Sequence, residues 1–184
     1  MISLYFVRHG SASSSWDVSA DPGLSDLGHQ QARQAARALQ QITPQPVPIA
    51  ASPLLRARET AQPLSDSWKA EITLAPEIAE IPSVDIPFDE RREWLSHLMQ
   101  AKWLGQPQYL IEWRNAILDL VHTQKRDTVF FTHFMVLNVI VGALTGTDRI
   151  VSFQPDNCAI TIVDIENGLP VLRTKGDEAI TVVR

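Results

Sequence analysis

The sequence predicts an α/β fold, in which helices cover both faces of a mostly parallel sheet. Short apolar runs alternate along the chain with longer segments of helical periodicity, which is the pattern of repeated strand–helix units. The run at residues 127–132 is almost wholly apolar or β-branched, as expected for a parallel strand that is buried on both faces. A chain of 184 residues is long enough to bury a substantial core without disulfides or metal.

The first half of the chain supplies three predicted strands and two helices. Ser25 is a suitable N-cap for the first helix, because its side-chain oxygen can accept a hydrogen bond from a backbone N–H of the first turn. Three prolines within residues 43–48 end that helix. In chain order, we expect a strand at 2–7, a helix at 26–41, a strand at 47–51, a helix at 53–68 and a strand at 71–74.

The second half begins with a proline-rich, irregular stretch at residues 76–87. Asn167-Gly168 is a hairpin signal near the end of the chain. The expected elements are helices at 88–102 and 108–124, a strand at 127–132, a helix at 134–144 that closes at Gly146, and short strands at 150–153, 159–165 and 170–173. We expect one domain over residues 1–184, with a helical insert at about 76–124.

Composition narrows the classes of partner. The net charge of −5 argues against a general affinity for nucleic acid or anionic membranes, so phosphate chemistry requires a local cluster of cations. Cys158 is the only cysteine, which leaves no internal disulfide and no thiolate metal site. The apolar run at the N-terminus lacks a basic n-region and stops at Arg8, and no apolar stretch approaches the roughly 20 residues of a membrane span. We therefore expect a cytoplasmic protein without a membrane partner.

Cationic and titratable side chains recur where predicted strands end. Arg8 and His9 follow the first strand, Arg56 lies in the first turn of the helix after the second, and His133 follows the strand that ends at Thr132. The carboxyl ends of parallel strands meet at one edge of a sheet, so these four side chains should converge there. Two arginines, two histidines and nearby helix N-termini form a site for a dianion such as phosphate, beside which a histidine can act as a nucleophile.

These residues carry a family resemblance. Arg-His-Gly at 8–10, directly after an N-terminal strand, resembles the signature of the histidine phosphatase superfamily. Residues 24–32, LSDLGHQQA, are similar to the family segment L-[ST]-x-x-G-x-x-Q-A, and residues 52–61, SPLLRARETA, to S-x-L-x-R-A-x-x-T-A. Thr132-His133 resembles the family's second histidine. The resemblance implies the three-layer, phosphoglycerate mutase-like form of the predicted α/β fold.

The resemblance also implies a mechanism that uses no metal and no cofactor. His9 would attack the phosphorus to give a phosphohistidine, which water then hydrolyses. Arg8, Arg56 and His133 would neutralise the equatorial oxygens of the phosphoryl group.

A carboxylic acid completes the implied site, since the family protonates the leaving oxygen with a residue from an x-L-x-E type segment. Ile78-Ala79-Glu80 has the position of that segment, so Glu80 is the expected acid and Glu77 the alternative. Ser15 is an additional candidate donor to the phosphate. Phe134 stands after the second histidine, where the family more often has glycine.

The expected activity is the hydrolysis of a small phosphomonoester by a histidine phosphatase. Three alternatives stay open: phosphoglycerate mutase-type phosphoryl transfer, dephosphorylation of phosphohistidine in proteins, and a non-catalytic module that binds a phosphorylated ligand. The short chain and the acid-loop pattern argue against a mutase. The helical insert favours a covered pocket for a small molecule over a protein substrate. The full set of Arg8, His9, Arg56 and His133 argues against a module that only binds.

Overall fold

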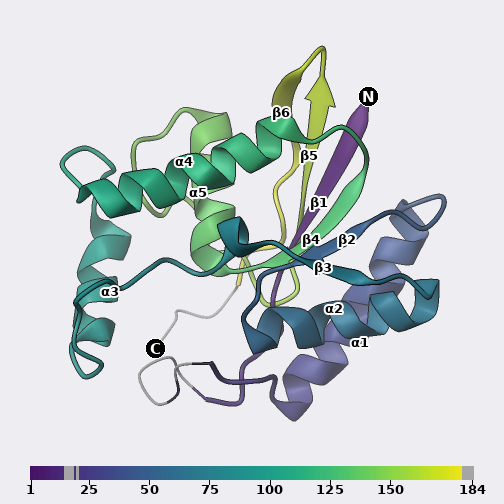
Figure 1. Cartoon of the computed structure of the whole chain (residues 1–184), viewed down its shortest axis with the longest axis horizontal. Coiled ribbons are helices and arrows are strands. Elements are labelled where there is room, and N and C mark those ends of the chain that lie inside the picture. The colour runs from purple at the N-terminus through teal and green to yellow at the C-terminus, as the bar shows by residue number, and fades with distance from the viewer. Residues whose placement is uncertain (15–18, 20, 180–184) are drawn as a thin grey trace.

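Six strands form one sheet in the order β3-β2-β4-β1-β5-β6 in the computed structural model, which describes residues 1–14, 19 and 21–179 (Figure 1). Neighbouring strands from β3 to β1 run parallel, whereas β5 is antiparallel to β1 and β6 to β5. The predicted, mostly parallel sheet is therefore confirmed. The strands are β1 (Ile2–Arg8), β2 (Ile49–Ala51), β3 (Ile72–Leu74), β4 (Thr128–Thr132), β5 (Ile160–Glu166) and β6 (Leu169–Thr174).

Helices cover both faces of the sheet, because successive residues of the buried central strand point to opposite faces. Tyr5 and Val7 of β1 pack with α1 and α2, whereas Leu4 and Phe6 pack with α4 and α5. Figure 1 shows α3 at the side of the molecule farthest from α1 and α2. The helices are α1 (Asp26–Ile42), α2 (Leu55–Trp68), α3 (Arg91–Gln100), α4 (Gln108–Thr123) and α5 (Phe134–Thr145), with a short 3₁₀ helix at Pro76–Ile78.

The strand expected at residues 150–153 is wrong. Ile150 and Phe153 are buried in the core, which gives this segment the apolar pattern of a strand. Its backbone N–H groups bond elsewhere: those of Ser152 and Phe153 donate to Oδ1 of Asn138, at 2.8 and 3.1 Å, and that of Ile150 donates to the carbonyl of Ala101 at 3.0 Å. A buried asparagine side chain thus satisfies backbone groups that a neighbouring strand would otherwise bond.

The loop after β1 is attached to the start of α1. Ser25 caps α1 as predicted, since its Oγ accepts a hydrogen bond from the Gly28 N–H at 3.1 Å. The Ser11 carbonyl accepts from Ser25, and Ser11 N–H donates to Gln31 Oε1 at 2.8 Å. A Cβ on Gly28 would lie 2.1 Å from the Ser11 carbonyl oxygen, so only glycine permits this contact.

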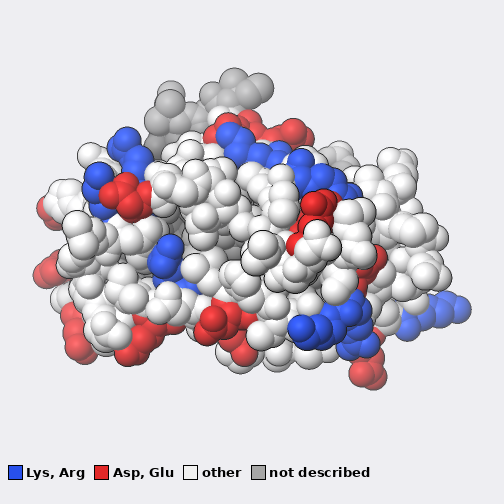
Figure 2. Space-filling view, turned by 90° about the horizontal axis from the view of Figure 1, so that it is seen from above, with Lys and Arg blue, Asp and Glu red and all other residues white. Residues whose placement is uncertain are grey.

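Charged side chains are mixed on the face in Figure 2, where Lys and Arg lie in several separate groups among acidic and uncharged residues. Across residues 1–14, 19 and 21–179, the helices are all too short or too polar to cross a membrane.

We expect Gly28→Ala to lower the free energy of unfolding by about 1–3 kcal/mol, the usual cost of overpacking, because its methyl group meets backbone that cannot easily move away. Gly142→Ala is the matched control. A Cβ there would lie 3.5 Å from its nearest neighbour, and alanine is favoured over glycine within a helix such as α5 by up to about 1 kcal/mol. Urea unfolding of both variants measures the difference, and equal stabilities would contradict the tight packing at Ser11.

Candidate active site

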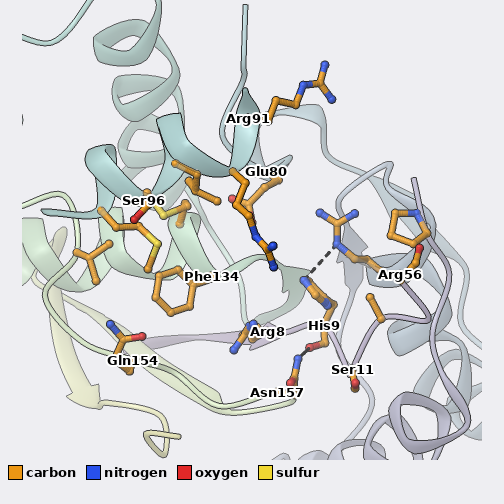
Figure 3. Close-up of a pocket in the computed structure, with 18 of the residues that line it drawn as sticks. Arg8, His9, Ser11, Arg56, Glu80, Arg91, Ser96, Phe134, Gln154 and Asn157 are labelled. Atoms are coloured by element: carbon orange, nitrogen blue, oxygen red, sulfur yellow. Dashed lines mark hydrogen bonds between the residues drawn. The ribbon is translucent and has the colours of Figure 1, made fainter. Parts of the chain in front are cut away.

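The ends of β1, β4 and β2 place the predicted residues side by side. Arg8, the last residue of β1, pairs with Thr132, the last residue of β4, and Ala51 of β2 pairs with Phe131. The chain leaves all three strands at the same level, which brings His9 and His133 together and places Arg56 next to them in the first turn of α2 (Figure 3).

Hydrogen bonds at its two ring nitrogens hold His9 in one tautomer. Nδ1 lies 2.7 Å from the Gly10 carbonyl oxygen, and because a carbonyl only accepts, Nδ1 carries the proton. Nε2 therefore has a free lone pair, which accepts a hydrogen bond from Arg56 Nε at 3.2 Å. Burial, followed by the charges of Arg56 and Arg8, lowers the pKa of His9 to about 3. The ring is neutral at neutral pH and has the electron pair that a nucleophile needs.

Arg56 is buried to 5% exposure and pairs only loosely with Asp21. Its Nη1 lies 4.0 Å from Asp21 Oδ1, and the same carboxylate accepts the N–H of Leu55 at 2.8 Å, at the start of α2. Burial lowers the pKa of Arg56, whereas Glu80 and Asp21 act in the opposite direction. A buried guanidinium next to His9 is well suited to hold an anionic oxygen, since the anion would offset its desolvation.

Arg8 is oriented by a segment that the sequence analysis did not include in the site. Its Nη1 donates to the Pro155 carbonyl at 2.7 Å, and its guanidinium lies 5.3 Å from the centre of the Phe134 ring. Asn157, in the same segment as Pro155, donates to the His9 carbonyl at 3.0 Å. The Pro155 carbonyl gives no sequence signal, because every residue has one.

His133 is fully buried beside His9 and is not among the residues that line the cavity described below. The two imidazole rings lie 5.2 Å apart, and His133 Nε2 lies 2.7 Å from Ser52 Oγ. Its Nδ1 has no hydrogen-bond partner among the described residues. Burial, together with the charges around His9, holds the pKa of His133 well below its usual range. The ring is therefore a neutral neighbour of His9 in this structure.

Glu80 lies in the wall of the same cavity, whereas Glu77 is exposed in the 3₁₀ helix and does not line it. One oxygen of Glu80 accepts the N–H of Ile81 at 2.9 Å. Burial raises the pKa of Glu80, against the opposing effect of that N–H, Arg56 and Arg8. A carboxyl group with a raised pKa keeps its proton at higher pH, as a general acid must. Ser15, the other candidate, lies outside the described residues.

A cavity of about 660 Å³ opens above these side chains (Figure 3). Arg8, His9, Arg56 and Glu80 line one part of it. The rest of its wall comes largely from α3 and the first residues of α5, a contribution that the sequence analysis did not predict beyond expecting a covered pocket. These residues are Arg91, Arg92, Leu95, Ser96, Met99 and Gln100 of α3, and Phe134 and Met135 of α5.

Two further side chains connect the motifs. Thr60 Oγ1 accepts the Gly10 N–H at 3.0 Å and donates to the Arg56 carbonyl at 2.6 Å. Glu59 accepts the N–H of Leu24 at 2.6 Å. The sequence did contain a signal for Thr60 and for Gln31, since both are fixed letters of the motifs that contain them. Within the described parts of the chain, no three His, Cys, Asp or Glu side chains are grouped so as to hold a metal ion.

Comparisons with known proteins identify a family and a shared fold. The family model of the histidine phosphatase superfamily (branch 1) matches residues 4–178. No curated protein matches the sequence significantly. Among solved structures, Bacillus stearothermophilus YhfR is 24% identical with a TM-score of 0.80, covering 97% of this chain and 98% of that chain.

Two solved phosphatases share the fold at lower identity. A phosphoserine phosphatase from Entamoeba histolytica, in complex with 3-phosphoglyceric acid, is 22% identical with a TM-score of 0.75 over 98% of each chain. A putative alpha-ribazole-5'-P phosphatase from Escherichia coli is 19% identical with a TM-score of 0.76 over 99% of each chain. These similarities confirm the predicted fold.

The geometry of His9 predicts an unusual titration. At about pH 5, where an ordinary histidine is mostly protonated, we expect a neutral ring with its proton on Nδ1. A long-range proton–nitrogen NMR spectrum detects this tautomer, and the signal is assigned by its loss in His9→Gln. A doubly protonated His9 ring at this pH would contradict the interpretation.

The lowered pKa of His9 also makes the free energy of unfolding depend on pH. Between about pH 6.5 and about pH 3 the unfolded chain binds a proton at His9 that the folded chain does not. Acidification through this range therefore favours unfolding, and His9→Gln should be less sensitive to it than the wild type.

Proposed function

The chain belongs to branch 1 of the histidine phosphatase superfamily, and from this membership we propose that it hydrolyses phosphomonoesters through a phosphohistidine intermediate on His9, without a metal. The observation that carries the proposal is the state of His9: a neutral ring with an unprotonated Nε2, in one cavity with the buried Arg56 and the half-buried Arg8. The phosphatase names of two proteins with the same fold, acting on phosphoserine and on alpha-ribazole-5'-P, support the same class of reaction.

In the first step, Nε2 of His9 attacks the phosphorus and the bond to the ester oxygen breaks. Arg56 transfers its hydrogen bond from Nε2 to a phosphoryl oxygen, and Arg8 holds another, so that both guanidinium groups stabilise the charge of the transition state. Glu80 gives its proton to the leaving oxygen, which departs as an alcohol. His133 is proposed to donate to a third oxygen through its Nδ1, with Ser52 hydrogen-bonded to Nε2.

In the second step, water replaces the alcohol. Glu80, now ionised, accepts a proton as the water oxygen attacks the phosphorus, and the bond to Nε2 breaks to release inorganic phosphate. The proton that Glu80 lost in the first step is thereby recovered, and His9 returns to its neutral form. The Gly10 carbonyl keeps Nδ1 protonated throughout and stabilises the positive charge that the ring gains while it carries the phosphoryl group.

A small substrate suits this cavity better than a folded phosphoprotein. Six residues of α3 line the wall of the cavity of about 660 Å³ that contains His9, which supports a substrate small enough to enter this space.

The nucleophile is tested by trapping the intermediate. The wild type and His9→Ala are each mixed with substrate that carries a labelled phosphoryl group, in the presence of a chelator, and are then denatured in alkali. Label should remain on the wild type and be absent from His9→Ala. Alkali is used because phosphohistidine survives base better than acid. His122→Ala is the matched control, since His122 is an exposed histidine at the end of α4 and should leave labelling unchanged. Label on His9→Ala would move the nucleophile elsewhere.

The acid is tested by changing the leaving group. Glu80→Gln keeps the shape of the side chain but has no acidic proton, so it should slow phosphoenzyme formation by about 10²–10⁴-fold with an alkyl phosphate. With nitrophenyl phosphate, whose phenolate departs without protonation, the loss should be much smaller. Single-turnover rates are compared, because Glu80 also assists water in the second step. Glu77→Gln serves as the control, and equal losses on both substrates would exclude Glu80 as the leaving-group acid.

A further inference from the structure

The cavity has two chemically different parts. One part contains Arg8, His9, Arg56 and Glu80, which the proposed function uses. The apolar part, defined by Leu95, Met99, Phe134, Met135 and Val151, has no role in transferring a phosphoryl group. Figure 3 shows Phe134 and Ser96 on one side of Arg8, and Arg56 and Ser11 on the other. The two parts therefore lie next to each other within one continuous space.

Phe134 forms the border between the two parts. It follows His133 directly as the first residue of α5, and the guanidinium of Arg8 lies 5.3 Å from its ring centre. A group bonded to a phosphoryl oxygen at Arg8 would therefore meet the phenyl ring at once. The resemblance described above leads one to expect a glycine at this position, which would leave that surface of the cavity without a side chain.

The direction of the reaction sends the leaving group into the cavity. In-line displacement puts the leaving oxygen on the side of the phosphorus opposite His9 Nε2, and Glu80 must lie beside that oxygen to protonate it. In Figure 3, Glu80 lies across the cavity from His9. The atoms beyond the leaving oxygen therefore extend into the rest of the cavity, whose wall includes Leu95 and Met99.

We infer that the apolar part binds the leaving group, and that the enzyme prefers phosphomonoesters of alcohols with an apolar alkyl or aryl body over esters of small polar alcohols; this inference rests on the proposed function. The volume agrees with it. A cavity of about 660 Å³ is in the range of about 300–1,000 Å³ that holds organic ligands of considerable size, and a phosphoryl group alone would fill little of it.

Polar side chains of α3 line the cavity as well. Arg91 is one of them, but its guanidinium lies 5.2 Å from the Phe88 ring and points away from Arg8 and His9 in Figure 3. Arg92, Ser96 and Gln100 lie in the same wall, so a polar or anionic ester is the competing substrate, and O-phosphoserine represents it in the experiment below. Leu95 and Met99 of the same helix would stabilise an apolar ligand through the removal of apolar surface from water.

A homologous series tests the preference. Ethyl, butyl and hexyl phosphate have leaving alcohols of nearly equal acidity, so differences in kcat/KM report binding of the alkyl chain and not the chemistry. Burial of one methylene is worth up to about fourfold, and with partial burial we expect kcat/KM to rise about tenfold or more from ethyl to hexyl phosphate. O-phosphoserine should be a poorer substrate than butyl phosphate.

Two variants locate the effect. Leu95→Asn and Met99→Gln should each lower kcat/KM for hexyl phosphate several-fold more than for ethyl phosphate. Met99→Gln keeps the length of the side chain, so it remains informative if Leu95→Asn reduces the melting temperature. Leu104→Asn is the matched control, because Leu104 is 89% exposed and lies outside the cavity; it should preserve the preference of the wild type.

The outcomes separate the two proposals. Phosphate release that is equal across the alkyl series, or highest with O-phosphoserine, would overturn the apolar leaving-group site while leaving the phosphatase proposal intact. A preference for hexyl phosphate that both variants keep would overturn the assignment to α3. If none of the esters releases phosphate, the proposed function fails and this inference fails with it.

Discussion

The hydrogen bond from Arg56 Nε to His9 Nε2, 3.2 Å long, is the contact on which the arrangement of the site depends. It joins residues 47 positions apart, and it can form because β1 and β2 both pair with β4, which lies between them. It also requires an Nε2 without a proton, and the Gly10 carbonyl meets this requirement by holding the proton on Nδ1. The arginines keep the ring neutral, and the neutral ring offers Arg56 an acceptor. The pairing of the strands, the tautomer of His9 and the charge of Arg56 are therefore all required for this one hydrogen bond.

Local sequence signals predicted the elements that local physics determines. The apolar run of β4 and the Ser25 cap of α1 were found because each signal lies within a few residues. The motifs also indicated that Arg8, His9, Arg56 and His133 converge. The irregular path at 150–153 could not be predicted. Its backbone is bonded by the side chain of Asn138, a single residue of α5 that carries no local signal for this role. The sequence favoured Glu80 over Glu77 only through the family resemblance, because the path of the chain around the 3₁₀ turn at Pro76–Ile78 determines which carboxyl lines the cavity.

The cavity combines residues from two kinds of structure. Its cationic side chains stand at strand ends or in a first helical turn, where the sheet determines their positions. Its apolar wall comes from α5 and from α3, which lies in the connection between β3 and β4 and contributes to the core chiefly through Leu98. Substitutions on the cavity side of α3 can therefore change the shape of the cavity without moving the groups around His9. Phe134 is the exception, because it contacts Arg8 and belongs to both sets.

The strand order also sets the sequence of events in folding. β1 is the first of the six strands in the chain, yet its two neighbours, β4 and β5, lie more than a hundred residues later. As the ribosome releases the chain, β1 and His9 emerge long before any strand with which they can pair. The entropy of closing such long loops must be overcome before these contacts form, which makes folding slow relative to proteins rich in local contacts. His9 is thus synthesised early but acquires its tautomer and its arginine neighbours late, when the centre of the sheet closes.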